Sequence, residues 1–105
     1  MPTPPHVDHS ISLTTAASFT KKYRDSNPSN IVKGGFFWKD QLIDMLNNSK
    51  AIGMRYYYGI DDNDSPVIIL TAVDGNGDDL YNDKLLDFAP QCPDVCSVNN
   101  PLNNG

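Results

Sequence analysis

The sequence predicts a small α+β domain in which two N-terminal helices pack on an antiparallel β-hairpin or small meander, with flexible N- and C-terminal tails. Two stretches with helical spacing come first, two β-rich segments around a turn follow, and the Pro- and Asn-rich ends lack an apolar framework. We therefore divide the chain into a flexible leader (1–10), a single domain (11–89) and a Cys-, Pro- and Asn-rich tail (90–105).

The first helix is expected at Leu13–Asp25. Ser12 is a residue type that favours the N-cap, and the DSNP sequence from Asp25 is a stop signal. Apolar residues at three- and four-residue spacing form a stripe along this helix: Leu13, Ala16, Ala17, Phe19 and Tyr23.

The second helix is expected to begin at Phe37 or Trp38 and to end at the NNSK sequence after Leu46. Leu42, Ile43 and Leu46 recur on one face. The opposite face is polar and carries Lys39, Asp40, Asp44 and Asn47. This helix is therefore amphipathic as well.

A β-hairpin is expected from Ile52–Ile60 and Val67–Val73, which flank the turn sequence DDNDSP. Alternation divides the first strand into two stripes. The stripe expected to face the helices is apolar: Ile52, Met54, Tyr56, Tyr58 and Ile60. Leu85, Leu86 and Phe88 are expected to seal the core as a short helix or an extended cover.

The other stripe of the first strand exposes Arg55 and Tyr57 between Gly53 and Gly59. These side chains form a candidate surface for binding a protein partner, because Arg and Tyr are favoured contact residues. The alternative is structural: Arg55 packs its stem over Tyr57 and keeps its head in water. The second strand is apolar on both faces, so residues 80–89 or a partner should cover it.

Charge and hydropathy exclude several partner classes. The net charge is -5, and the eight basic residues are dispersed, which disfavours nucleic acid. No apolar run is long enough for membrane insertion, and no secretory signal is visible. We expect a cytoplasmic protein, with export not excluded, and a homo-oligomer remains open.

The sequence does not predict an enzyme. His6 and His9 lie in the leader, where nothing holds them beside a nucleophile, and the aspartates cluster in turns. The KGG sequence at Lys33–Gly35 lacks the spacing of a phosphate-binding loop, so no cofactor is expected.

A weak calcium candidate lies in the turn after the hairpin. Asp74, Asn76 and Asp78 have the alternate spacing of the first EF-hand ligands. However, Asp79 stands where that loop needs Gly, and Leu85 stands where it needs Glu. A plain Asp/Gly turn is the preferred interpretation, and no metal site is predicted.

Cys92 and Cys96 are the only cysteines, and their spacing is compatible with only some kinds of cysteine site. Zinc would need His6 and His9 as further ligands, and a thioredoxin motif has two intervening residues, not three. A local disulfide and a pair of free thiols both remain, and either would shape the tail.

The motifs GMRYYYG at Gly53–Gly59, VDGNGDDL at Val73–Leu80 and CPDVCS at Cys92–Ser97 resemble those of a family of short, uncharacterised bacterial proteins. That family has a G-[IM]-R-[IY]-Y-Y-G strand and a C-P-x-x-C-S tail. The resemblance implies that Arg55 and the cysteines belong to a recurring pattern, and it implies no catalytic residues. We therefore expect a non-catalytic interaction module or an accessory subunit of a larger bacterial assembly, such as a secretion machine. A redox- or metal-responsive protein that uses the cysteine pair is the alternative.

Overall fold

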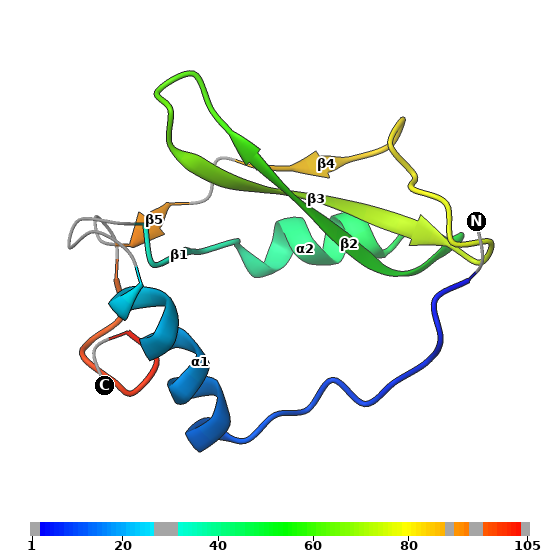
Figure 1. Ribbon diagram of the computed structural model, residues 1–105. Coiled ribbons are helices and arrows are strands. Elements are labelled where there is room, and N and C mark those ends of the chain that lie inside the picture. The colour runs from blue at the N-terminus through cyan, green and yellow to red at the C-terminus, as the bar shows by residue number, and fades with distance from the viewer. Residues whose placement is uncertain (1–2, 27–31, 88–89, 93–95, 104–105) are drawn as a thin grey trace. The chain divides into compact units, whose positions relative to one another are not determined.

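A computed structural model describes residues 3–26, 32–87, 90–92 and 96–103. The described chain is α+β and contains, in order, α1 (Leu13–Asp25), β1 (Gly34–Gly35), α2 (Lys39–Leu46), β2 (Ala51–Ile60), β3 (Pro66–Asp74), β4 (Leu85–Leu86) and β5 (Gln91–Cys92) (Figure 1). All strand pairs are antiparallel, in a three-stranded sheet of order β2-β3-β4 and a two-stranded sheet of β1 and β5. The predicted α+β class and the presence of two helices are thus confirmed.

Contacts divide the chain into two compact units. The hairpin unit comprises Met1–His6 and Phe36–Ala89, and the helix–tail unit comprises Val7–Gly35 and Pro90–Gly105. This grouping differs from the expected leader, domain and tail, because both ends of the chain make contacts of their own. Thr3 in the leader, for example, donates a hydrogen bond to the Gly75 carbonyl. The expected boundaries of independently folding domains stay a prediction.

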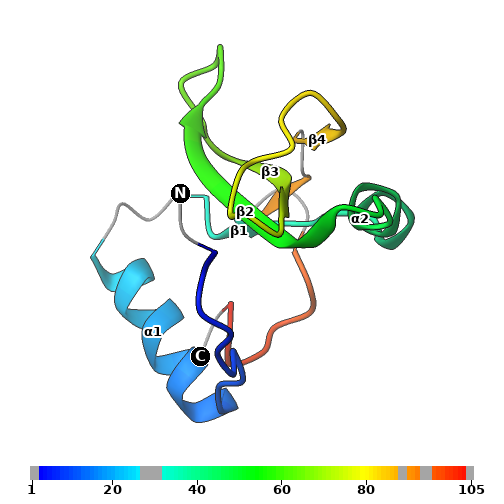
Figure 2. The same ribbon diagram turned by 90° about the vertical axis from the view of Figure 1, so that its right-hand side faces the viewer.

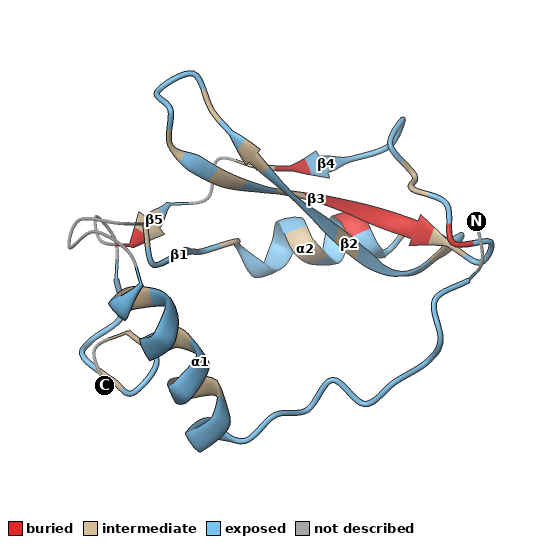
Figure 3. Cartoon of the chain, viewed as in Figure 1, coloured by how far each residue is buried: buried red, intermediate tan, exposed pale blue. Residues whose placement is uncertain are grey.

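The hairpin unit is built on the register of β2 and β3. Tyr56 pairs with Leu70, and the ladder is regular from Gly53 to Ile60, with a bulge between Ala51 and Gly53. α2 packs on one face of this hairpin, and Figure 2 views that helix nearly end-on beside the sheet. The core cluster consists of Met45, Leu70, Ala72 and Leu86, with Phe37, Leu42, Ala51 and Leu80 packed around it. Figure 3 shows that burial is concentrated in β3.

One detail of the expected packing is corrected in this unit, and one open alternative is decided. The inward residue of α2 is Met45, at 3% exposure, whereas Ile43 and Leu46 are exposed. Leu85 and Leu86 form the short strand β4, which is the extended alternative, and Leu86 enters the core. Phe88, expected to join them, lies outside the described residues.

The helix–tail unit contains α1, whose predicted bounds are confirmed. The Ser12 hydroxyl accepts a hydrogen bond from the backbone N–H of Thr15, as expected of an N-cap. The predicted stripe is not buried, however, because Leu13 and Phe19 are exposed. The packing of α1 on the hairpin therefore stays a prediction.

The described part of the C-terminal tail contacts its own unit closely. Arg24 of α1 donates to the Leu102 carbonyl (2.8 Å), and the backbone N–H of Lys33 donates to the Cys92 carbonyl (2.7 Å). β5 pairs with β1, so that Gly34 lies opposite Cys92. Residues expected to form a flexible tail thus have specific partners.

Candidate functional site

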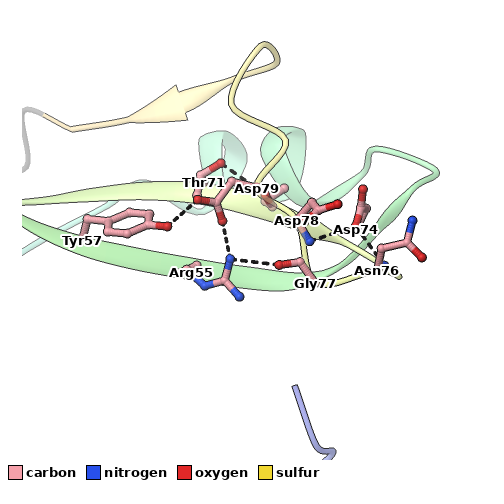
Figure 4. A network of polar contacts seen from close by, with 9 residues as sticks. Arg55, Tyr57, Thr71, Asp74, Asn76, Gly77, Asp78 and Asp79 are labelled. Atoms are coloured by element: carbon pink, nitrogen blue, oxygen red, sulfur yellow. Dashed lines mark hydrogen bonds and ion pairs between the residues drawn. The ribbon is translucent and has the colours of Figure 1, made fainter. Parts of the chain in front are cut away.

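The clearest polar cluster of the hairpin unit consists of Arg55, Tyr57 and Asp79, and we call it the Arg–Asp–Tyr cluster. Arg55 Nη1 lies 2.5 Å from Asp79 Oδ1 and also donates to the Gly77 carbonyl (3.2 Å). The Tyr57 hydroxyl donates to Asp79 Oδ2. Figure 4 shows the carboxylate between the two side chains and beside Thr71, which is only 2% exposed. The cluster therefore lies over a buried position of β3.

Both β2 residues reach Asp79 because of strand alternation. Arg55 and Tyr57 are two residues apart, so they project from the same face of the sheet. Arg55 lies opposite Thr71 in the register, and Asp79 bridges to Val73 on the other side of β3. The carboxylate thus approaches across β3 from the far edge of the sheet.

The turn that follows β3 fixes the position of Asp79. Asp74 Oδ1 accepts hydrogen bonds from the backbone N–H groups of Asn76 (2.9 Å) and Asp78 (3.0 Å). Gly77 has a φ of 85°, a left-handed conformation that suits glycine. The Leu80 N–H then donates to the Ala72 carbonyl, which returns the chain to the sheet. The DGNG sequence is therefore a tight turn that places a carboxylate over the sheet.

Near neutral pH, the charged and polar groups of the cluster satisfy one another. The pKa of Asp79 is lowered, chiefly by the hydrogen bond from Tyr57 and also by Arg55, although desolvation acts in the opposite direction. The pKa of Tyr57 is raised, first by its bond to Asp79, and the pKa of Arg55 is raised for the same reason. Asp79 is thus ionised while Tyr57 keeps its proton. This arrangement suits holding the turn in place, and neither group is poised to move a proton near neutral pH.

These contacts change the interpretation of Arg55 and Tyr57 as binding residues. If Arg55 had no binding role, we expected its guanidinium group to stay in water. In the structure this group forms an ion pair with Asp79. Tyr57 keeps 47% of its surface exposed, so it remains available for contact on its ring. Sequence reasoning missed Asp79, although one signal was present: a second Asp directly follows the turn, where the chain rejoins the sheet.

The calcium candidate gains no support from the structure. Asp74 uses one carboxylate oxygen to hold its own turn, and Asp79 faces Arg55. Within the part of the chain that the structure describes, no group of three His, Cys, Asp or Glu side chains is placed to hold a metal ion.

The opposite face of β2 carries an exposed apolar stripe, which we call the tyrosine stripe: Met54, Tyr56, Tyr58 and Ile60. Their exposures are 43%, 54%, 80% and 75%, and the rings of Tyr56 and Tyr58 meet edge to face with centroids 5.5 Å apart. Ile68, opposite Tyr58 on β3, is also exposed.

This stripe lies on the face of the hairpin that carries Leu70 and Ala72, against which α2 packs, and its expected packing against α1 stays a prediction. The eight residues of α2 span only about 12 Å. The ten residues of β2 span about 33 Å. α2 is thus too short to cover the whole stripe, and Tyr58 and Ile60 are its most exposed residues.

Cys92 and Cys96 form a disulfide, with Cα atoms 4.8 Å apart. Cys92 is 8% exposed and belongs to β5. The cross-link therefore closes a loop directly after the strand that pairs with β1. Because Cys92 lies in a paired strand, the disulfide is attached to the helix–tail unit and not only to the tail itself.

No known protein family, curated protein or solved structure matches this chain. The resemblance to short bacterial proteins therefore stays a prediction. Among the helices of the described chain, none is long and apolar enough to cross a membrane.

Proposed function

We propose that this chain is a non-catalytic protein-interaction module, acting as an accessory subunit of a larger bacterial assembly, and that the β2–β3 hairpin is its contact surface. The observation that carries the proposal is the tyrosine stripe, where four consecutive same-face residues of β2 are 43–80% exposed. Single exposed apolar residues are common, but contiguous ones are typical of interaction sites.

The two faces of the hairpin have complementary roles in this proposal. The tyrosine stripe supplies rigid amphipathic side chains, which contribute strongly at interfaces. The Arg–Asp–Tyr cluster fixes the adjoining turn through an ion pair and hydrogen bonds. Tyr57 extends the contact surface to the second face, in keeping with its predicted role.

The proposal is tested by capturing partners with tagged protein and comparing Tyr58→Ser with a matched control. Tyr81→Ser is that control, because Tyr81 is 68% exposed but lies outside the hairpin strands. We expect Tyr58→Ser to lose the partner and Tyr81→Ser to retain it, with little change in the unfolding midpoint of either variant. Equal retention by both variants would exclude the tyrosine stripe as the contact surface.

A redox-responsive role is the second candidate, and the disulfide beside β1 favours it. In a reducing cytoplasm the two cysteines would cycle between thiols and disulfide, whereas after export the bond would be permanent. Intact mass of protein isolated under thiol-trapping conditions separates the two. A mixture of oxidised and reduced chains that follows the redox state of the cell supports the responsive role, and a uniformly oxidised population contradicts it.

A further inference from the structure

β2 forms an open edge of the three-stranded sheet. Among the residues described, no strand pairs with its outer side. Such an edge offers N–H and C=O groups to another strand, and proteins often block it with Lys, Pro or bulges. β2 has neither Lys nor Pro, and Arg55, its charged residue, is paired with Asp79. Its bulge lies between Ala51 and Gly53, so the edge is regular from Gly53 to Ile60.

The backbone groups on this open edge belong to even-numbered residues. The Asp61 N–H donates to the Ser65 carbonyl (3.0 Å), which marks a directly bonded pair at the hairpin turn. Bonded and non-bonded pairs alternate along an antiparallel ladder, so the odd-numbered residues of β2 bond to β3. The N–H and C=O groups of Met54, Tyr56 and Tyr58 therefore point outward.

The far side of β3 gives an independent check of this parity. The Leu80 N–H donates to the Ala72 carbonyl, and the Asp74 N–H donates to the Asp78 carbonyl. Even-numbered residues of β3 thus bond away from β2. Its odd-numbered residues, which lie opposite the odd-numbered residues of β2, bond toward β2.

The sequence of β2 is symmetric about Tyr56 at two of the four flanking residue pairs. Ile52–Ile60 reads Ile-Gly-Met-Arg-Tyr-Tyr-Tyr-Gly-Ile. A second copy that pairs antiparallel on a two-fold axis through Tyr56 places isoleucine opposite isoleucine and glycine opposite glycine. It also places Met54 opposite Tyr58 and Arg55 opposite Tyr57 of the second copy. We propose that β2 pairs in this register with β2 of a second copy, joining the two three-stranded sheets into one.

The proposed register satisfies the outward backbone groups. It makes Tyr56 opposite itself a bonded pair, and the bonded pairs on either side join Met54 to Tyr58. Each bonded pair exchanges two hydrogen bonds, which gives about six over this segment. The tyrosine stripes of both copies then lie side by side on one face, where Met and Tyr make favourable sulfur–aromatic contacts. Because β2 repeats isoleucine and glycine symmetrically about Tyr56, it is complementary to itself in this register, and a second copy is the occupant that we propose.

Charge at the ends of the segment agrees with the same register. In this register the end of β2 that follows Lys50, which is exposed, lies nearest to the Asp61–Asp62 turn of the second copy, although the regular ladder ends at Gly53. The two-fold axis brings the same opposite charges near each other at both ends of the segment. The resulting attraction counteracts the repulsion expected between chains of net charge -5.

Sedimentation equilibrium of the purified full chain, with Tyr56→Lys and Tyr56→Glu variants, tests the register. We expect wild type to shift from one chain mass to twice that mass as concentration rises. Each variant should remain at one chain mass, because like charges then lie directly opposite each other. An equimolar mixture of the two variants should recover the doubled mass, because the opposed charges are then of opposite sign.

Position 58 provides the matched control, because residue 58 faces residue 54 and not itself. A mixture of Tyr58→Lys and Tyr58→Glu should therefore show no comparable recovery. Circular dichroism verifies that each variant is folded. A wild type that stays at one chain mass, a Tyr56→Lys variant that still doubles, or recovery at position 58 in place of position 56 would each overturn the proposed pairing.

This inference rests on the hairpin being an interaction surface, but its failure is distinguishable from failure of that function. Sedimentation uses purified chain alone, whereas partner capture reports on another protein. A monomeric wild type that loses its captured partner on Tyr58→Ser overturns the self-pairing only. A wild type that dimerises but needs no hairpin residue for partner capture overturns the accessory role only.

Discussion

The hairpin unit and the helix–tail unit are stabilised by different means. The hairpin unit has a paired ladder between long strands and a cluster of buried apolar side chains around Leu70. In the helix–tail unit, α1 buries none of its residues, and β1 and β5 have two residues each. That unit depends on a disulfide and on hydrogen bonds such as that from Arg24 to the Leu102 carbonyl. A chain with one small apolar core can thus order a second region by covalent and polar links.

The largest effect is expected from Leu70→Ala, which truncates a core side chain of the hairpin unit. Leu70 is 4% exposed in the core, and truncating a buried leucine costs about 2–5 kcal/mol of unfolding free energy. Urea unfolding measures the loss, and hydrogen exchange should locate it in β2 and β3. Leu85→Ala is the control, because Leu85 is about half exposed and should cost much less. Equal losses would contradict the assignment of the core.

A smaller effect is expected from opening the disulfide, which acts on the other unit. Closing so short a loop stabilises the folded state by about 2 kcal/mol in the chain-entropy model. A Cys92→Ser, Cys96→Ser double variant should increase hydrogen exchange around Gly34 and in α1. Amides of β2 and β3 should keep their protection. Equal loss of protection in both units would show that they unfold together and that the contrast between them is false.

The smallest effect is expected from Asp79→Asn, and it depends on pH. Because folding lowers the pKa of Asp79, its stabilisation is present above the ordinary Asp pKa of about 3.9 and is lost as pH falls below it. Wild type should therefore be more stable than the variant near neutral pH, and the two should converge in acid. Thermal unfolding across this range measures the difference. Asp62→Asn, at an exposed turn position, should not reproduce the convergence.

Much of the local structure was predictable because short-range chemistry determines it. Ser12 and the residues after Asp25 set the bounds of α1, and β-rich segments around DDNDSP set the hairpin. The exposure of the tyrosine stripe was not predictable by alternation, since alternation separates two faces without saying what covers either. It depends on α2 being much shorter than β2, so that α2 does not cover the whole stripe.

The candidate site likewise combines residues that the sequence predicted with one that it did not. Arg55 and Tyr57 were identified from their place on one stripe of a strand, which is a property of sequence spacing alone. Their partner Asp79 was not identified, because it is 24 residues from Arg55 and reaches it only across β3.

Local sequence specifies the helix bounds, the hairpin, the turn after β3 and the two faces of β2. It does so because capping, turn chemistry and alternation act over a few neighbouring residues. Tertiary contacts bring Asp79 to Arg55 and Tyr57 and set Cys92 in a strand opposite Gly34, and they leave the residues of the tyrosine stripe exposed. Those outcomes depend on long-range contacts, and local pattern does not specify which distant segments meet.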